Sequence, residues 1–404
     1  MDGKNKIQWA MNWMPVLDNI RKGFISNKPF KDLKISMALH LEAKTAALAY
    51  TLKQGGAKVR ISGCNPLSTD DEVAASLKDD FGVSVFAKRG LTREEYYEHL
   101  EKTIEIEPDI IIDDGGDLTA LALKDKRTYK NIKGGNEETT TGVVRLKNME
   151  KAGALKFPMF DVNDALMKHL FDNRYGTGQS TIDGILTATN LVVAGKNVVV
   201  GGYGWCGRGI ANKMRGLGAN VTVTEIDPFK SIEAHMDGFI VKPMEEAIGY
   251  ADFVITATGV KDIVTPELLK DAKDGVVLAN SGHFNNEVAV EDIEKEFGKG
   301  KVVRRNVKAY TVGKKKAYVL SDGRLVNLAS GQGHPVEIMD LSFSIQALTA
   351  KYIAENPPKQ VKVYPVPSEI DLEVATIYLK SYGIKLDKLT REQQRYINSW
   401  QEGT

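Results

Sequence analysis

Short apolar runs alternate with stretches of helical periodicity along the first 160 residues of the chain. The apolar runs are typical of buried parallel strands and cover residues 34–39, 58–62, 83–87, 109–113 and 155–160. Helical patterns precede and separate them, at residues 1–33, 43–54, 70–80 and 93–105. Residues 134–142, GGNEETTTG, are interpreted as a polar connection. This alternation predicts a doubly wound α/β sheet, whose ligands lie beyond the carboxyl ends of the strands.

A second unit of the same kind begins with the β-branched run at residues 198–200. This run leads into three glycines in G-x-G-x-x-G spacing, Gly202, Gly204 and Gly207. A helix is expected to begin near Cys206, and the next strand to end at Glu225. Such glycines permit a tight turn, the approach of a pyrophosphate to the backbone, and close helix–strand packing. The free N–H groups of the helix start suit the phosphates. Glu225 suits a ribose 2′-hydroxyl and would repel a 2′-phosphate, so the pattern predicts NAD rather than NADP.

The two units imply two Rossmann-like domains joined near residues 165–180. The second sheet is expected to continue through 253–256 and 276–279 to about residue 327. Ligands prefer clefts between domains, so the site is expected between the two sheets. The last segment has a helical pattern, and Thr390 is the predicted cap of its final helix.

Composition narrows the class of protein without giving a function. The 404 residues are 42% hydrophobic and 26% charged with a net charge of +1, so nucleic acid is not an expected partner. The two cysteines, Cys64 and Cys206, cannot make a disulfide framework, and no metal site is predicted. Without a membrane-length apolar stretch or a signal-peptide pattern, we expect a cytoplasmic protein that does not bind a membrane.

Longer motifs along the chain point to one family. They are CNPLST at 64–69, DDGGDLT at 113–119, EETTTG at 137–142, DVNDALMKHLFDN at 161–173, NSGHF at 280–284, GRLVNLA at 323–329 and GHP at 333–335. Over practically its whole length the sequence resembles adenosylhomocysteinase, the S-adenosyl-L-homocysteine hydrolase family. The resemblance implies a homotetramer of chains with a substrate-binding domain at 1–164 and 335–371, a hinge at 165–180, an NAD-binding domain at 181–334 and an oligomerisation tail at 372–404.

The family splits a nucleoside thioether into L-homocysteine and the nucleoside, as part of the S-adenosylmethionine cycle. Its NAD is used without being consumed. Oxidation of the 3′-hydroxyl to a ketone makes the C4′ proton removable, after which the thiol is eliminated, water adds and the ketone is reduced again. The resemblance therefore implies a base for the hydroxyl, a second base for C4′, and acids for sulfur and water.

Matched motif by motif, the resemblance implies three groups of site residues. The catalytic group comprises His40, Asp114, Lys168, Asp172, Asn173 and His283. The substrate-binding group comprises Glu42, Lys44, Thr45, Asn65, Ser68, Thr69, Glu138, Asn163 and His334. The cofactor-binding group comprises Thr139, Thr140, Thr141, Gly202, Tyr203, Gly204, Trp205, Cys206, Gly207, Glu225, Thr258, Gly259 and Asn327. Lys168 and Asp172 are expected at the 3′-hydroxyl, where Lys168 must be partly neutral to accept a proton, and Asp114 at C4′.

The purine-facing segment departs from the pattern of adenosine-handling relatives. They follow the site histidine with H-x-T-x-E-T, whereas residues 40–45 of this chain are HLEAKT. Glu42 only accepts hydrogen bonds and Lys44 only donates them, so the pair suits the ring N–H and the 6-oxo group of hypoxanthine. The chain thus resembles the S-inosyl-L-homocysteine hydrolase branch. A strict S-adenosyl-L-homocysteine hydrolase is the alternative, with Glu42 and Lys44 as solvated residues of a first helical turn.

Taken singly, the same residues have plainer explanations. Asp113 and Asp114 suit an ordinary turn, and Lys168 and Asp172, at i and i+4, suit a solvated helix pair. A non-catalytic NAD-binding regulator and an ordinary NAD dehydrogenase are the competing functions, because both use the same fold. Two further departures from the family are Thr177, where many relatives have cysteine, and the absence of the C-terminal extension that reaches the NAD of a neighbouring chain.

Overall fold

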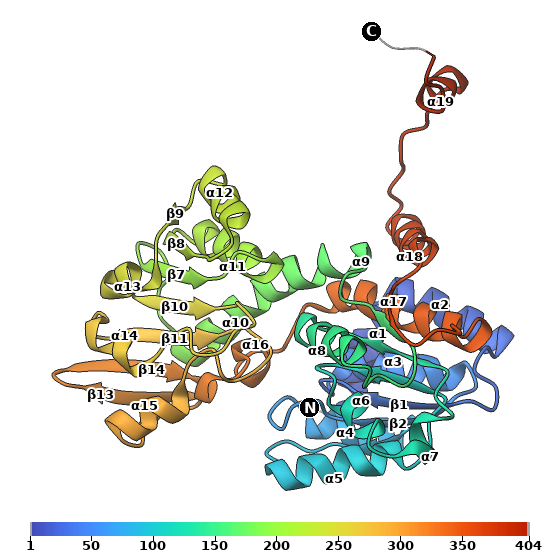
Figure 1. Cartoon of the computed structure of the whole chain (residues 1–404), viewed down its shortest axis with the longest axis horizontal. Helices are drawn as coiled ribbons and strands as arrows, with labels where there is room; N and C mark the ends of the chain where they lie inside the picture. Colours follow the sequence, from blue (N-terminus) through green and yellow to red (C-terminus); the bar gives the residue numbers. More distant parts are fainter. Residues whose placement is uncertain (1, 402–404) are drawn as a thin grey trace.

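The computed structural model describes residues 2–401 and has two α/β domains followed by a helical C-terminal segment (Figure 1). The first domain contains a seven-stranded sheet, and the second contains an eight-stranded sheet. Helices cover both faces of each sheet, as in doubly wound folds. The predicted fold class is therefore confirmed.

The first sheet is parallel throughout, in the order β15-β6-β5-β4-β1-β2-β3. Its strands are β1 (Lys34–Ala38), β2 (Lys58–Ser62), β3 (Ser84–Phe86), β4 (Ile110–Asp113), β5 (Gly134–Glu137), β6 (Met159–Asp161) and β15 (Val363–Pro365). The helices of this part are α1 (Gly3–Asn12), α2 (Pro15–Asn27), α3 (Ala43–Gln54), α4 (Asp71–Asp79), α5 (Arg93–Ile104), α6 (Asp117–Ala122), α7 (Lys126–Tyr129) and α8 (Thr140–Lys151). Central strand residues such as Ile110 and Ile112 are fully buried in the core of this domain.

Three elements of this domain differ from the sequence prediction. The leading segment is two helices rather than one, because the chain breaks at Met14 and restarts with Pro15 at the first helical position. The polar stretch contains the buried strand β5, and the strand predicted at 155–160 begins only at Met159. Strand β5 has no apolar side chain because its glycines leave room for neighbours: a Cβ on Gly135 would lie 2.6 Å from the sulfur of Met159.

The second sheet is mixed, in the order β12-β13-β14-β11-β10-β7-β8-β9, with only the β12–β14 meander antiparallel. Its strands are β7 (Asn197–Gly201), β8 (Asn220–Thr224), β9 (Ile240–Val241), β10 (Phe253–Thr256), β11 (Val276–Asn280), β12 (Lys301–Arg304), β13 (Val307–Val312) and β14 (Lys315–Leu320). Its helices are α10 (Thr177–Thr189), α11 (Trp205–Gly216), α12 (Pro228–Met236), α13 (Met244–Ala247), α14 (Pro266–Asp271), α15 (Val290–Phe297) and α16 (Val326–Ala329), with 3₁₀ turns at Ile248–Tyr250 and Ser321–Gly323. Two apolar clusters fill the two faces of this sheet.

Two segments connect the domains. The first runs through α9 (Leu166–His169) and a π-helical turn (Asp172–Gly176) directly into α10. The second leads from α16 into α17 (Val336–Glu355), a long and largely buried helix that packs against α2 and α3 of the first domain. The chain then adds β15 to the edge of the first sheet beside β6. Both connections therefore pass next to the space between the two sheets.

The C-terminal segment consists of α18 (Ser368–Ser381), which packs against α2 and α17 of the first domain, and α19 (Arg391–Ile397), which projects away from both domains (Figure 1). The predicted cap is correct: the side chain of Thr390 accepts a hydrogen bond from Gln393 N, and the Gln393 side chain accepts one from Thr390 N. Every residue of α19 is exposed. Among residues 2–401, no helix is long and apolar enough to cross a membrane.

Candidate active site

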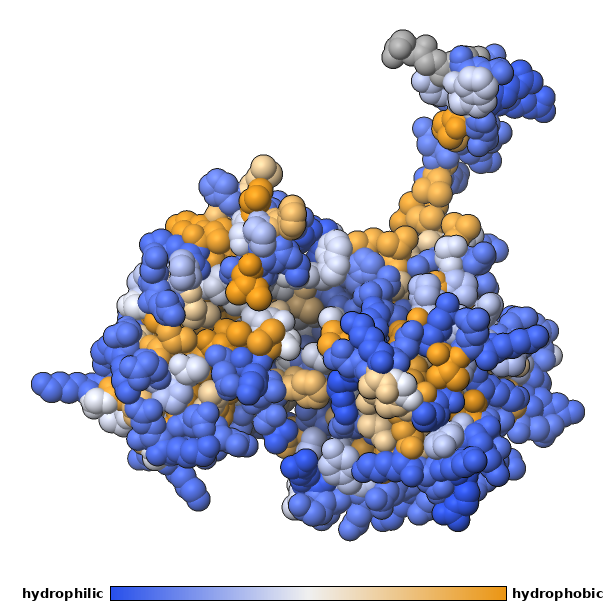
Figure 2. All heavy atoms as spheres, viewed as in Figure 1, coloured by the Kyte–Doolittle hydropathy of each residue, from blue (hydrophilic) through white to orange (hydrophobic). Residues whose placement is uncertain are grey.

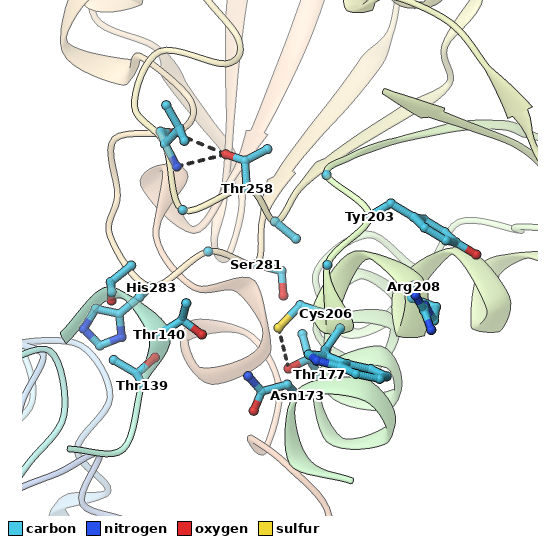
Figure 3. A pocket seen from close by; sticks show the side chains of 18 of the residues that line it. Thr139, Thr140, Asn173, Thr177, Tyr203, Cys206, Arg208, Thr258, Ser281 and His283 are labelled. Carbon is cyan, nitrogen blue, oxygen red and sulfur yellow. Dashed lines mark hydrogen bonds between the residues drawn. The ribbon is translucent and has the colours of Figure 1, made fainter. Parts of the chain in front are cut away.

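A cavity of about 1310 Å³ lies between the two domains, where the molecular surface is hollowed (Figure 2). Its walls come from the loops at the carboxyl ends of both sheets, as expected for doubly wound folds. Figure 3 shows Thr139, Thr140 and His283 on one side of the cavity, with Cys206 and Tyr203 across from them. Most of the residues predicted for the site line this one cavity.

The glycine-rich turn has the geometry that a dinucleotide requires. Gly202 has a φ of +92°, and a Cβ on Gly207 would lie 1.9 Å from the carbonyl oxygen of Gly202, so only glycine permits this packing. At Gly204, by contrast, a Cβ would meet no described atom within 4 Å, which leaves the turn open to a phosphate. Glu225 follows the strand next to this turn, and its carboxylate accepts a hydrogen bond of 2.7 Å from Tyr203 N. Each glycine thus has the geometry that its predicted role needs.

Three residues that line the cavity have a buried polar atom without a hydrogen-bond partner within residues 2–401. One atom is Arg208 Nε; the other two, Thr141 Oγ1 and Asn327 Oδ1, come from different domains. A buried polar atom without a partner is costly, so these two atoms are suited to a ligand that spans the cavity. Together with the open turn at Gly204, they show that the residues present fit NAD.

Glu287 is a functional residue that the sequence analysis did not identify. Its buried carboxylate accepts hydrogen bonds from Thr258 N, Thr258 Oγ1 and Gly259 N, at 2.8–2.9 Å. Burial raises the pKa of Glu287, although these donors oppose the shift. The carboxylate therefore holds the loop after β10 against the cofactor half of the cavity. Nothing in the sequence around Glu287 signals this contact, because its partners lie 28–29 residues away.

Lys168 lies at the centre of a buried group of charges. Its Nζ is 3.3 Å from Asp172 Oδ1 and 3.4 Å from Glu138 Oε1, and each of these three side chains is at most 8% exposed. It also donates to Asn173 Oδ1 at 2.8 Å, and Asn173 Nδ2 in turn donates to Asn163 Oδ1 at 2.9 Å. The interpretation as a solvated helix pair is therefore wrong.

The charge state expected for Lys168 needs correction. Burial alone would lower its pKa, but the nearby carboxylates of Asp172, Glu138 and Asp114 outweigh burial and raise it above the ordinary value. The pKa of Asp172 is likewise held below its usual range: burial would raise it, but Lys168 and His334 outweigh burial. Lys168 is thus an ammonium ion in this arrangement, because carboxylates rather than cations surround it.

Asp114, which also lines the cavity, lies between two histidines from different domains. Asp114 Oδ2 is 3.5 Å from His40 Nε2, and Asp114 Oδ1 is 3.6 Å from His283 Nδ1. Cys64 Sγ donates to Asp114 Oδ2 at 3.5 Å. Burial lowers the pKa of His40 to about 4 despite the attraction of Asp114, so His40 is neutral near pH 7. The ligand atoms of His40, Asp114 and His283 lie within 4.8 Å of one another, close enough to exchange protons through a substrate.

Four predicted substrate residues lie behind the cavity wall rather than on it. Ser68 Oγ is 2.7 Å from His40 Nδ1 and so orients the ring, while Asn65 closes its own turn by accepting from Leu67 N. Thr69 is buried behind the same loop. Lys44 donates to Glu42 and to two carbonyl oxygens of the second connection between the domains. Of the purine-facing residues, Glu42 and Thr45 line the cavity, and the Thr45 hydroxyl donates to the His40 carbonyl.

The chain is similar to known proteins along its whole length. Residues 1–131 match the family described as S-adenosyl-L-homocysteine hydrolase, and residues 173–333 match its NAD binding domain. The adenosylhomocysteinase of Thermoplasma volcanium is 62% identical over 99% of this chain and 98% of the relative. The S-inosyl-L-homocysteine hydrolase of Methanocaldococcus jannaschii is 56% identical over 100% of this chain and 97% of the relative.

A solved structure shares the fold at much lower identity. The crystal structure of a dipicolinate synthase chain from Bacillus halodurans superposes with a TM-score of 0.52 at 14% identity, covering 81% of this chain and 99% of that one. This likeness concerns the fold alone. The relatives, which are similar over their full length, and the geometry of the cavity lead to the same conclusion: the chain belongs to the S-adenosyl-L-homocysteine hydrolase family and is an NAD-dependent hydrolase.

Proposed function

We propose that this hydrolase cleaves S-inosyl-L-homocysteine in preference to S-adenosyl-L-homocysteine, releasing L-homocysteine and the nucleoside. The observation that carries the proposal is that one cavity is lined both by the dinucleotide-binding turn and by two groups of proton-transferring side chains. These two groups surround Lys168 and Asp114. An ordinary dehydrogenase needs only one such group, because it moves a single proton with its hydride.

The group around Lys168 is assigned to the 3′-hydroxyl of the ribose. NAD, when bound, supplies the oxidation of that hydroxyl and the final reduction. Lys168 donates to the 3′ oxygen and orients it, while Asp172 and Glu138 balance its charge and accept from the ribose hydroxyls. The proton that leaves the hydroxyl passes to a carboxylate of this group rather than to water, because Lys168 is already protonated and the three side chains are buried.

The group around Asp114 is assigned to C4′ and the departing sulfur. Asp114 removes the C4′ proton, which becomes acidic once the neighbouring carbon is a ketone. His40 is neutral near pH 7 and lies 3.5 Å from Asp114, so it can take a proton from that carboxyl and deliver it to the thiolate. His283 contributes from the other domain, so the arrangement is complete only when the domains are close together.

The purine preference rests on Glu42 and Lys44. Lys44 Nζ is 2.6 Å from Glu42 Oε2, 2.8 Å from the His334 carbonyl oxygen and 3.0 Å from that of Gln332, so all three of its donors are in use. A hypoxanthine ring N–H takes the place of Lys44 at the Glu42 carboxylate, and the freed N–H of Lys44 turns to the 6-oxo group. An adenine amino group at that position faces an ammonium donor instead, which is unfavourable.

The test is an assay with both thioethers in the presence of NAD. Release of homocysteine without net formation of NADH is expected, with a higher kcat/KM for the inosyl compound. Accumulation of NADH without homocysteine would indicate a dehydrogenase instead. Binding of NAD with neither product, under conditions in which a characterised hydrolase turns over, would indicate a non-catalytic regulator.

We further propose that the chain acts as a homotetramer in the cytoplasm. The segment that follows α18 and includes α19 projects from the molecule and shows apolar surface (Figure 2). Its exposed apolar side chains include Leu386, Ile397 and Trp400, which are 69%, 63% and 90% exposed. Exposed apolar residues in one segment are typical of an interface. The two cysteines are free thiols, as suits a reducing compartment.

A further inference from the structure

The carboxylate of Glu138 is held from one side by the helix that follows the second connection between the domains. Ser342 Oγ donates to Glu138 Oε1 at 2.7 Å, and Gln346 Nε2 donates to Glu138 Oε2 at 2.6 Å. Both donors lie on α17, one helical turn apart, and both residues are fully buried. Each oxygen of Glu138 therefore has one fixed donor of its own before any ligand binds.

The remaining neighbours of Glu138 are charged. Lys168 Nζ lies 3.4 Å from Oε1, and the carboxylates of Asp172 and Asp114 also act on it. Burial raises the pKa of Glu138, as do Asp172 and Asp114, whereas Lys168 and Gln346 lower it. The two donors from α17 thus stabilise the ionised form of Glu138, whereas burial and the neighbouring carboxylates favour its neutral form. If Glu138 took up a proton, Lys168 would lose one of the charges that hold it.

Hydrogen bonds between buried side chains of α17 and the site occur on the side of the helix that faces Glu138, and they are not a general property of the helix. Ser344 and Thr349 are equally buried on the same helix, yet their hydroxyl oxygens have no hydrogen-bond partner within residues 2–401. The helix also begins two residues after His334, whose ring contacts Asp172 at 3.1 Å. The segment from His334 to Gln346 therefore contacts both carboxylates that flank Lys168.

We propose that Ser342 and Gln346 are positioning residues that keep Glu138 ionised and oriented toward the ribose hydroxyls, and through Glu138 maintain the charge on Lys168. The proposal rests on the assignment of Lys168 and Glu138 to the ribose under the proposed function. A carboxylate has about four acceptor positions, so with the donors of α17 in place Glu138 can still accept from a ribose hydroxyl. The donors contact no substrate atom themselves, and their effect passes through Glu138.

The test compares Ser342→Ala and Gln346→Met with Ser344→Ala, a matched control on the same helix whose hydroxyl has no hydrogen-bond partner within residues 2–401. Removing one donor should raise the pKa of Glu138, so the acidic limb of the kcat/KM profile should move up by about one pH unit. On the acidic limb, below the pKa of Glu138 in both proteins, this corresponds to a loss of about tenfold, which should shrink at higher pH. Ser342→Thr, which keeps the hydroxyl, should retain the wild-type profile. Ser344→Ala should leave the profile unchanged.

A second measurement separates positioning from general damage to the helix. Binding of the product nucleoside and of its 2′-deoxy analogue should differ less in Gln346→Met than in the wild type, because the mispositioned Glu138 no longer favours the hydroxyl. Unfolding midpoints should be measured alongside. An equal loss of activity at every pH, or unchanged discrimination between the two nucleosides, would overturn the proposal. No turnover in the wild type would instead overturn the proposed function.

Discussion

His334 Nδ1 lies 3.1 Å from Asp172 Oδ1, so a residue of the second connection between the domains contacts a carboxylate of the first connection. Asp172 in turn lies 3.3 Å from Lys168. The two segments about which the domains would move are therefore joined through the charges assigned to the ribose. A change in the angle between the domains would therefore alter the surroundings of Lys168.

Thr177 is expected to set the tautomer of His334. Its Oγ1 lies 3.3 Å from His334 Nε2, and if the hydroxyl donates there, the ring proton sits on Nδ1 and is donated to Asp172. Thr177→Val removes this donor, allows the other tautomer and should lower kcat about tenfold. Thr177→Ser should keep most of the activity. Homocysteine release measures both variants, and equal activity of the valine and serine variants would contradict the role.

Lys168 and Asp114 should affect different steps. Lys168→Met should prevent oxidation of bound nucleoside, while Asp114→Asn should permit oxidation but slow exchange of the C4′ hydrogen. Each loss is expected to be about 10²–10⁴-fold. Rapid-mixing absorbance of reduced nicotinamide reports the first step, and deuterium incorporation at C4′ reports the second. Two variants that oxidise and exchange equally well would contradict the separation into two groups.

The sequence predicts best the helices and strands whose apolar side chains recur with one clear period. The helix at 43–54 and the strand at 58–62 have the predicted bounds, because each carries a continuous apolar pattern between turn residues. Strand β5 could not be found that way. Its residues are Gly134, Gly135, Asn136 and Glu137, and its burial comes from neighbours such as Met159 and Ile353 that pack on the glycines.

The candidate site shows the same division. The cofactor turn follows from glycine spacing within a strand–helix–strand pattern that ends in an acid, and the residues around Lys168 follow from the family's motifs. The hydrogen-bond donors to Glu138 cannot be predicted in this way. Ser342 and Gln346 lie 204 and 208 positions from Glu138, in a helix of ordinary composition. The expectation that Lys168 is partly neutral fails for a related reason: its pKa is raised by the carboxylates that the fold brings near it, and the sequence does not show which these are.

Asp340 should make stability depend on pH. Its buried carboxylate accepts from Val16 N and Leu17 N at the start of α2, and burial raises its pKa to about 7 despite these donors. The folded state therefore holds a proton that the unfolded state releases between about pH 4 and pH 7. Asp340 thus stabilises the fold most at low pH, and this contribution is lost as the pH rises toward about 7.

Urea unfolding of the wild type and of Asp340→Asn measures this effect. The difference in unfolding free energy between the two proteins should change by about 4 kcal/mol at most from pH 4 to pH 7, in the direction that weakens the wild type. The amide keeps an acceptor for α2 but does not titrate in this range. A difference that stays constant with pH would show that the Asp340 carboxyl is ionised throughout.

Trp400 should contribute to assembly rather than to the fold of the single chain. Its side chain is 90% exposed at the end of the projecting segment. Trp400→Ser should reduce the mass measured by light scattering at low protein concentration, with little change in the unfolding midpoint of the separated chain. Lys388→Ser, an exposed polar position of the same segment, is the control. An unchanged mass for the tryptophan variant would argue against the interface.

The purine preference should reverse when the two residues that set it are exchanged for those of adenosine-handling relatives. The wild type should favour the inosyl over the adenosyl thioether by about a hundredfold in kcat/KM, because an unpaired donor facing the Lys44 ammonium is costly for adenine. In Glu42→Thr with Lys44→Glu, a hydroxyl can donate to the adenine ring nitrogen and a carboxylate can accept from its amino group. The ratio of the inosyl to the adenosyl kcat/KM should therefore fall below one.

Lys44→Glu also removes the donors to the carbonyl oxygens of Gln332 and His334. We therefore expect kcat to drop for both substrates together, while the ratio of their kcat/KM values reports recognition of the base alone. A wild type that uses the adenosyl compound equally well would overturn the assignment of Glu42 and Lys44.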